Sequence, residues 1–245
     1  MQAGKLQVRQ FRYNRDNFSY LIFNEREAAV IDGGAVELIA AFLHARALEL
    51  RFVFNTHNHG DHTLGNQDLL ELTDAEYIDC HWLADLKRLV FGGEHIAIYR
   101  TPGHTVDSIC FHLDRVLITG DTLFNGTVGN CFSGDMLSFY DSLMMLCSLP
   151  ETTIIYAGHD YVRSSLAFAR RLEPLNRDID RYLERYDRKH VCSQLKDELL
   201  VNPYLRFNEE SIVSHLRRHY LPVATAYERW RSLMSIDYPD LVILQ

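Results

Sequence analysis

The sequence predicts an α/β fold with a helical C-terminal extension, and three observations support this. Short apolar segments rich in β-branched and aromatic residues alternate with segments whose apolar residues recur at helical spacing. Beyond about residue 160 the spacing is helical throughout. Four predicted strands end in His or Asp, and because active sites of α/β folds lie at strand ends, these residues predict one common site.

Composition limits the class of protein. The 245 residues can form one large domain or a domain with a smaller appendage, and 47% hydrophobic and 24% charged residues are typical of a soluble globular protein. A net charge of -8 disfavours nucleic acid as a partner. The N-terminus has no apolar core of signal-peptide length, and no segment approaches a membrane span, so we expect a cytoplasmic protein without a membrane partner. The five cysteines include no Cys-x-x-Cys pair and are expected to be reduced.

The first part of the chain is predicted to start as an antiparallel meander, because polar turns separate three strands. Strands and helices then alternate without a linker, an internal repeat or a low-complexity segment. The predicted strands are 6–13, 18–23, 28–32, 51–55, 76–79, 94–99, 115–119 and 153–158. The predicted helices are 36–48, 66–72, 82–90, 162–172, 176–190, 209–218 and 223–234.

The loop after strand 51–55 carries three histidines and an aspartate within six residues: His57, His59, Asp61 and His62. Gly60 permits a sharp turn there, so these side chains can converge on one point. Neutral imidazole and carboxylate are ligands of divalent transition metals. The loop therefore predicts a metal site, and its dense spacing disfavours the alternative of an ordinary polar surface loop.

Three further strands end in the same residue types. His104 lies in a turn after strand 94–99, Asp121 follows strand 115–119, and His159 follows strand 153–158. A single turn histidine is a weak signal, but an aspartate that closes a buried strand needs a partner, and a metal ion is one. Because His or Asp follows four predicted strands, the whole set is a much more specific signal for a metal site than any one residue.

The ordered set of these seven residues resembles the metallo-β-lactamase superfamily over about the first 170 residues. The resemblance implies an αβ/βα sandwich, in which two mixed sheets pack face to face with helices outside and the metals lie at one edge. It assigns His57, His59 and His104 to one metal, Asp61, His62 and His159 to the other, and Asp121 to a bridge between them.

Such a set predicts hydrolysis by a metal-bound hydroxide, because two divalent ions that share one water lower its pKa toward neutrality. We expect Asp121 and Asp61 to be catalytic. Asp121 supplies the negative charge that lets two cations approach each other, and Asp61 can orient the hydroxide and handle its proton. Zinc is the expected metal, with iron and manganese as alternatives. Asp32 either supports a ligand or is an ordinary turn residue.

Two branches of the superfamily disagree with this sequence. Many β-lactam-cleaving members have cysteine where Asp121 stands, and flavodiiron-type oxygen reductases have glutamate near His59. By contrast, the segments 120–124, 158–161 and 202–207 resemble the hydroxyacylglutathione hydrolases, or glyoxalase II family. That resemblance implies cleavage of the thioester S-D-lactoylglutathione, with a helical domain that helps to bind glutathione. We therefore predict a catalytic domain at 1–172 and a helical substrate-side domain at 173–245.

The sequence departs from that family on the substrate side. Asn130 stands where the family has a basic residue for the glutathione glycine carboxylate, and Phe132 stands where it has a tyrosine. Asn208 and Glu210 replace an expected basic pair, and only Tyr161 keeps a recognisable role. Asn130, Phe132 and Tyr161 are the candidate substrate-binding residues. The substrate is therefore predicted less specifically than the reaction: a small-molecule thioester, S-D-lactoylglutathione or a related one.

Two other functions remain as alternatives. A persulfide dioxygenase would use a single iron on two histidines and an aspartate; Asp160 slightly favours it, whereas the helical extension argues against it. A binding or metal-storage protein without catalysis is disfavoured because no ligand is missing. The sequence does not determine the oligomeric state.

Overall fold

The computed structural model describes residues 5–236, and its centre is a pair of mixed sheets. The first sheet has the strand order β1-β2-β3-β4-β5, antiparallel from β1 to β3 and parallel from β3 to β5. It therefore opens with the predicted meander. Its strands are β1 (Gln7–Tyr13), β2 (Asn17–Phe23), β3 (Glu27–Ile31), β4 (Glu49–Phe54) and β5 (Glu76–Ile78).

The second sheet has the order β13-β12-β9-β8-β7-β6, in which only β12 and β9 run parallel. Its strands are β6 (Arg88–Phe91), β7 (Glu94–Arg100), β8 (Ile109–Leu113), β9 (Val116–Gly120), β12 (Ile154–Ala157) and β13 (Ser193–Gln194). A short hairpin follows β9 and consists of β10 (Leu123–Phe124) and β11 (Thr127–Val128).

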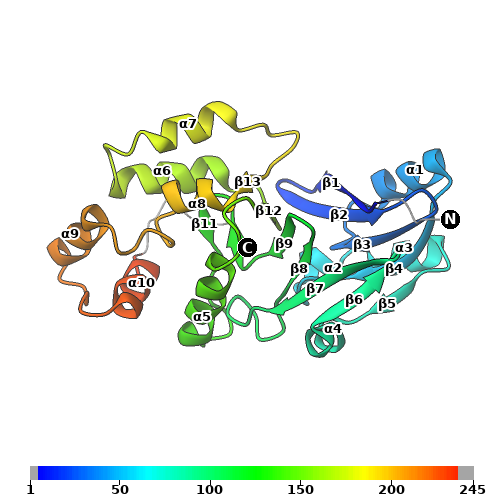
Figure 1. Ribbon diagram of the computed structural model, residues 1–245, viewed down its shortest axis with the longest axis horizontal. Coiled ribbons are helices and arrows are strands. Elements are labelled where there is room, and N and C mark those ends of the chain that lie inside the picture. Colours follow the sequence, from blue (N-terminus) through cyan, green and yellow to red (C-terminus); the bar gives the residue numbers. More distant parts are fainter. Residues whose placement is uncertain (1–4, 237–245) are drawn as a thin grey trace.

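The helices fall into two groups in Figure 1, one beside the first sheet and one at the opposite end of the molecule. Those of the first part are α1 (Val36–Arg46), α2 (Gly60–Thr63), α3 (Asn66–Leu72) and α4 (Cys80–Leu86). The others are α5 (Met136–Cys147), α6 (Val162–Leu172), α7 (Asp178–Arg185), α8 (Leu195–Val201), α9 (Glu210–Arg218) and α10 (Ala226–Met234).

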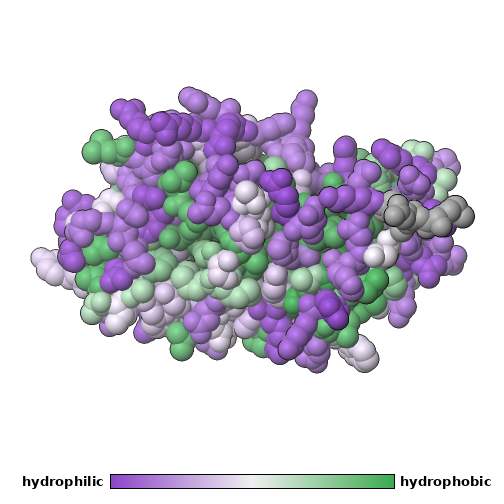
Figure 2. All heavy atoms as spheres, viewed as in Figure 1, coloured by the Kyte–Doolittle hydropathy of each residue, from purple (hydrophilic) through white to green (hydrophobic). Residues whose placement is uncertain are grey.

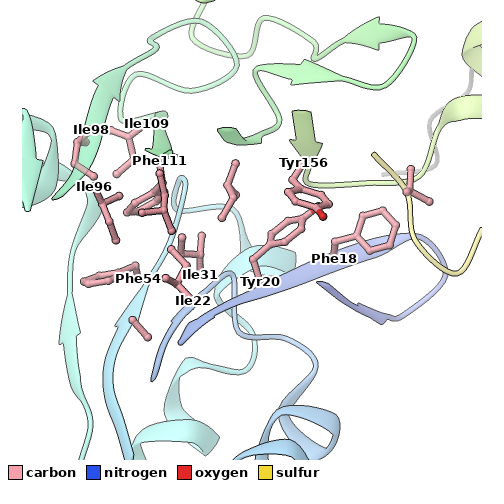
Figure 3. Packing of buried hydrophobic residues seen from close by; sticks show 14 of the residues in the cluster. Phe18, Tyr20, Ile22, Ile31, Phe54, Ile96, Ile98, Ile109, Phe111 and Tyr156 are labelled. Carbon is pink, nitrogen blue, oxygen red and sulfur yellow. The ribbon is translucent and has the colours of Figure 1, made fainter. Parts of the chain in front are cut away.

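The inner faces of the two sheets form one apolar core. Alternate residues of a strand point to opposite faces, so Tyr20 and Ile22 of β2 point inward toward β9 and β12. Figure 3 shows Tyr20 and Tyr156 facing each other across the sandwich, with ring centroids 5.2 Å apart. Phe54 of β4 stacks similarly on Phe111 of β8 at 5.8 Å.

The outer faces are covered by helices. Leu21 of β2, between the two inward residues, packs in the cluster that contains Ile39 of α1 and Leu69 of α3. On the other sheet, Leu117 and Ile155 pack with side chains of α5, α6 and α8 to α10. Helices thus lie outside two facing sheets, which confirms the predicted sandwich with its helical C-terminal part.

Two predicted helices were wrong in extent. The predicted helix 82–90 ends at Leu86, because Lys87 is left-handed (φ 56°), and the next four residues pair with β7 as strand β6. The predicted helix 176–190 ends at Arg185, since Tyr186 is extended and its hydroxyl bonds Asp160. Tertiary contacts outweigh the local helical spacing in both places. Strands β8 and β13 and helices α5 and α8 were not predicted.

The surface agrees with this arrangement. Helix α7 buries Ile179 and Tyr182 and presents polar residues outward, and Figure 2 shows hydrophilic side chains along this upper edge. Among residues 5–236, the helices are too short or too polar to cross a bilayer. Residues 1–4 and 237–245, at the ends of the two predicted domains, lie outside the described residues.

Candidate metal centre

All seven residues of the predicted metal set meet at one edge of the sandwich. The histidine loop follows β4, His104 follows β7, Asp121 follows β9 and His159 follows β12. Backbone hydrogen bonds join segments at this edge: Ile109, at the start of β8, donates to the carbonyl of Thr56 at 2.9 Å, and Gly158 donates to that of Gly120 at 2.8 Å. The four segments are therefore held at fixed spacing by the two sheets.

The first group is made of three imidazoles. Nδ1 of His59 lies 3.0 Å from Nε2 of His57 and 3.0 Å from Nε2 of His104. His57 and His104 are buried. Because burial disfavours the charged form, it lowers the pKa of both His57 and His104. Both rings are therefore neutral, as metal ligands must be.

The second group combines two imidazoles with a carboxylate. Nε2 of His62 and Nε2 of His159 lie 3.2 Å apart, and Oδ2 of Asp61 lies 3.3 Å from His159 Nε2 and 3.7 Å from His62 Nε2. Burial opposes a charge on His62, but the carboxylates of Asp121 and Asp32 outweigh it and raise its pKa to about 10. A metal ion that binds here replaces a proton.

Asp121 lies between the two groups. Its Oδ2 is 3.5 Å from His104 Nε2 and 3.4 Å from His159 Nε2, and its Oδ1 is 3.3 Å from His62 Nε2. Asp121 Oδ1 is buried and makes no hydrogen bond, although it lies 3.3 Å from His62 Nε2. A buried carboxylate oxygen without a hydrogen bond is costly, and a cation between the groups would satisfy it.

The outer ring nitrogens determine which way four of the histidines face. Nδ1 of His104 donates to the carbonyl of Asn130 at 2.9 Å, and Nδ1 of His159 and of His62 face the carboxylates of Asp16 and Asp32 at 3.0 and 2.9 Å. These acceptors require the hydrogen on Nδ1, which leaves the Nε2 lone pair pointing inward.

His57 is oriented through Thr56. The Thr56 hydroxyl donates to Asp32 at 2.8 Å and lies 3.0 Å from His57 Nδ1, so it accepts the hydrogen of that ring. Asp32 is fully buried and also accepts from the Thr56 amide at 2.8 Å. Asp32 therefore acts on two histidines, one directly and one through Thr56.

The spacing of the inner atoms fits metal ions. With metal–nitrogen bonds of about 2.0–2.1 Å and tetrahedral angles, neighbouring donor atoms lie roughly 3.3 Å apart. Lone pairs facing one another at such distances repel unless a cation lies among them. The three groups of mutually close donor atoms are His57, His59 and His104; His57, His62 and Asp121; and Asp61, His62 and His159. These residues fit two divalent ions with Asp121 next to both.

Gly158 leaves the space that this arrangement needs. A Cβ at that position would lie 2.2 Å from Asp121 Oδ1 and 2.8 Å from His62 Cε1. Any side chain there would displace the central carboxylate, so the glycine before His159 is required by close approach and not by backbone conformation.

Two of the three candidate substrate residues flank the first group. The half-exposed ring of Phe132 packs edge-on against His59 and His104, at centroid distances of 5.6 and 5.2 Å. Asn130 has an exposed side chain, and its backbone carbonyl holds His104. These residues therefore form the rim above His59 and His104.

Tyr161 lies beside the second group. Its ring stacks on His159 at 5.0 Å with an interplanar angle of 6°. Burial raises the pKa of Tyr161, so its phenol is protonated at neutral pH and can donate a hydrogen bond.

Other residues considered in the sequence have structural contacts. Asn208 accepts from Arg229 at 2.9 Å, and Glu210 pairs with Arg217 at 2.9 Å, both within the helical part. Asp160 binds Arg12 and the hydroxyl of Tyr186. Near α4, the adjacent residues Asp79, Cys80 and His81 also lie close together, but Asp79 caps the helix there by accepting from the His81 amide.

The sequence interpretation missed Asp16 and Asn17, which it treated only as part of a polar turn. Asp16 contacts His159, and Asn17 Nδ2 donates to Asp61 Oδ2 at 2.8 Å. The only local indication of their role was that aspartate and asparagine can hydrogen-bond a metal ligand. Their partners, His159 and Asp61, are far away in the sequence.

Comparison with known families agrees with the fold and the site. The sequence model of the metallo-beta-lactamase superfamily matches residues 12–81 and 75–159, and that of the hydroxyacylglutathione hydrolase C-terminus matches residues 160–233. The chain is 33% identical over 216 residues to a hydroxyacylglutathione hydrolase from Methylobacillus flagellatus, covering 81% of this chain and 86% of the relative. It is 30% identical to one from Vibrio cholerae, covering 93% and 99%.

Solved structures share the fold. The BLEG-1 B3 metallo-beta-lactamase superposes with a TM-score of 0.62 at 20% identity, covering 81% of this chain and 99% of that one. ETHE1 from Myxococcus xanthus superposes with a TM-score of 0.62 at 25% identity, covering 92% and 99%. The sequence models and the relatives together show that the chain belongs to the metallo-beta-lactamase superfamily and, within it, to the hydroxyacylglutathione hydrolase family of metal-dependent hydrolases.

Proposed function

We propose that the protein hydrolyses an acyl thioester, S-D-lactoylglutathione or a related one, at a centre of two divalent metal ions. The observation that carries the proposal is the convergence of six ligand-type side chains around the buried carboxylate of Asp121, whose Oδ1 makes no hydrogen bond. The relatives' name and the C-terminal family match support a glutathione thioester as the substrate.

We assign His57, His59 and His104 to one metal, Asp61, His62 and His159 to the other, and Asp121 to both. Zinc suits imidazole and carboxylate ligands, and iron and manganese are the alternatives that metal analysis would distinguish. When bound, two such ions lower the pKa of a shared water and polarise the thioester carbonyl.

The residues themselves supply orientation and proton handling. Asp32, Asp16 and the Asn130 carbonyl fix the imidazoles so that their Nε2 atoms point inward. Asp61 is half-exposed, so its carboxylate can accept a hydrogen bond from the attacking water and take its proton. The Tyr161 hydroxyl can donate to the substrate beside His159, and Phe132 shields the ligands below it.

We further propose that residues 1–172 form the catalytic domain and 173–245 the substrate-side domain. Helix α6, which ends the first of these domains, supports a close connection between them, because its Phe168 and Leu172 pack in one apolar cluster with side chains of α8, α9 and α10. The cytoplasmic location stays a prediction from the sequence.

The test is the hydrolysis rate of S-D-lactoylglutathione by metal-loaded protein, with an EDTA-treated sample and other glutathione and coenzyme A thioesters alongside. We expect chelator-sensitive turnover of at least one thioester, with release of the free thiol. Metal-replete protein that turns over none of them would refute the proposal. Oxygen uptake with glutathione persulfide would instead establish the persulfide dioxygenase.

A further inference from the structure

The turn between β1 and β2 contacts one ligand group from outside. Asp16 Oδ1 lies 3.0 Å from Nδ1 of His159, and Asn17 Nδ2 donates to Oδ2 of Asp61 at 2.8 Å. Neither Asp16 nor Asn17 belongs to the seven assigned ligands. Both act on ligands of the second group, His159 and Asp61.

The backbone holds this turn rigidly against the end of β12. Phe18 donates to the carbonyl of Gly158 at 2.8 Å, and Asp160 donates to that of Asp16 at 2.9 Å, so hydrogen bonds flank His159 on both sides. Asn17 is itself buried, and its amide nitrogen is also 3.5 Å from His159 Nε2. Tyr13, at the end of β1, adds a bond from its hydroxyl to the Asp61 carbonyl at 2.7 Å.

The first ligand group is supported by other parts of the chain. His104 is held by the Asn130 carbonyl and His57 by Thr56. In the contacts described for residues 5–236, Asp16 and Asn17 reach neither of these histidines nor His59. Asp32 supports both groups, through His62 and through Thr56, whereas the described contacts of Asp16 and Asn17 reach the second group alone.

The chemistry of the two contacts favours metal binding. A carboxylate that accepts the Nδ1 hydrogen makes the imidazole more basic at Nε2 and fixes the ring orientation. An amide donor on one carboxylate oxygen restricts the rotation of Asp61 without competing as a metal ligand, because the amide nitrogen has no lone pair to offer. Removal of such an outer partner costs about 10–100-fold in metal affinity.

We propose that Asp16 and Asn17 are positioning residues for one metal position only, the one formed by Asp61, His62 and His159. The inference rests on the two-metal assignment made under the proposed function. It predicts that the N-terminal hairpin controls the occupancy of the second position independently of the first.

Metal titration of the full-length protein tests this. Zinc is added to metal-free wild type, Asp16→Ala, Asn17→Ala and Arg15→Ala, and both binding steps are measured by calorimetry and metal analysis. Arg15→Ala is the matched control, because it truncates an exposed side chain in the same turn. We expect one of two equivalents to bind about 10–100-fold more weakly in the Asp16 and Asn17 variants and no change in the control. Two unchanged equivalents, or equal weakening of both, would overturn the proposal.

A double-mutant cycle identifies the affected position. Asp16→Ala should weaken the remaining equivalent in a His104→Ala background, which keeps the second group, and should have no further effect in a His159→Ala background. The same effect in both backgrounds would contradict the proposal. If Asp16→Ala does not fold, Asp16→Asn serves in the same cycle, with a smaller effect because its amide oxygen still accepts from His159. Wild type that binds fewer than two equivalents would refute the two-metal assignment instead.

Discussion

The proposed metal centre and the proposed substrate-side rim differ in how firmly their side chains are held. His57, His62, His104 and His159 are buried, and each is oriented by a hydrogen bond to an outer partner. On the rim, the side chains of Asn130 and Phe132 are exposed.

Under the proposed function, this difference would let the fold keep its reaction while its substrate changes. In the proposed centre, a shift of His62, His104 or His159 would break the hydrogen bond between its Nδ1 and its outer partner. A rim side chain can be replaced without moving any ligand, since the backbone carbonyl of Asn130 holds His104 whatever the side chain is. Substitutions in the two regions should therefore have effects of different kinds.

The largest expected effect is that of Asp121→Ala. Loss of the carboxylate shared by both groups should abolish binding of at least one metal and lower the hydrolysis rate by about 10³-fold or more, because metal ions contribute several kcal/mol to transition-state stabilisation. Metal analysis and thioester kinetics measure both effects. His95→Ala, on exposed β7 surface, is the control and should keep full metal content; equal loss in the two variants would contradict the ligand assignment.

Glu173→Gln tests whether the helical part can be destabilised while the proposed metal centre stays intact. Glu173 is buried and accepts from Arg206 Nε at 2.7 Å and Nη2 at 2.9 Å. The variant removes this charge-assisted pair and leaves partly buried Arg206 with Glu209 at 3.9 Å, at a cost of about 1.5–3 kcal/mol in the free energy of unfolding at pH 7. Chemical denaturation measures this, and metal content should not change. Parallel loss of both metals would show that the two regions are not separable.

The Glu173–Arg206 pair also predicts how the free energy of unfolding changes with pH. Burial alone raises the pKa of Glu173, but hydrogen bonding and the charge of Arg206 outweigh it and lower this pKa below its usual 4.5. The carboxylate therefore stabilises the fold above pH 4.5, and its contribution is lost as the pH falls through the lowered pKa. The stability difference between wild type and Glu173→Gln should shrink below pH 4.5; a constant difference would exclude this cause.

Gly158→Ala tests the close packing of the centre. The added methyl group would meet Asp121 Oδ1 at 2.2 Å, so we expect metal affinity to fall by about 10–100-fold. Gly60→Ala is a matched control inside the histidine loop. The sequence predicted a turn that needs this glycine, but Gly60 begins helix α2 without a positive φ, and a Cβ there meets nothing within 4 Å. Competition with a graded series of chelators measures both variants, and unchanged affinity in Gly158→Ala would show that the carboxylate is free to move.

Asn130→Lys should have the smallest effect and concerns the rim alone. A cation at this position could make a charge-assisted hydrogen bond to an anionic thiol moiety, which at about 1.5 kcal/mol corresponds to roughly a tenfold gain in kcat/KM for S-D-lactoylglutathione, mainly through KM. A thioester of an uncharged thiol is the control and should show no gain. Equal gains on both substrates would mean that the effect is not recognition of charge.

The local sequence predicted most of the framework. The predicted strands 51–55, 115–119 and 153–158 correspond to β4, β9 and β12, which end at Phe54, Gly120 and Ala157, and the ligand-type residues that follow them meet as expected. It did not predict that Lys87 divides a helix from strand β6, because that boundary depends on pairing with β7. Helix α5 was also missed; its N-cap Asp135 was a local signal, but its apolar residues pack against C-terminal helices.

The sequence by itself determined which residues can bind metal, because ligand chemistry is a property of side-chain type and the four strand ends are local features. Only the tertiary structure decided which groups orient those ligands. Asp16 and His159 are 143 positions apart and meet because the turn after β1 in one sheet lies against the end of β12 in the other. Periodicity shows which face of a strand is buried, but carries no information about which distant segment will cover its end.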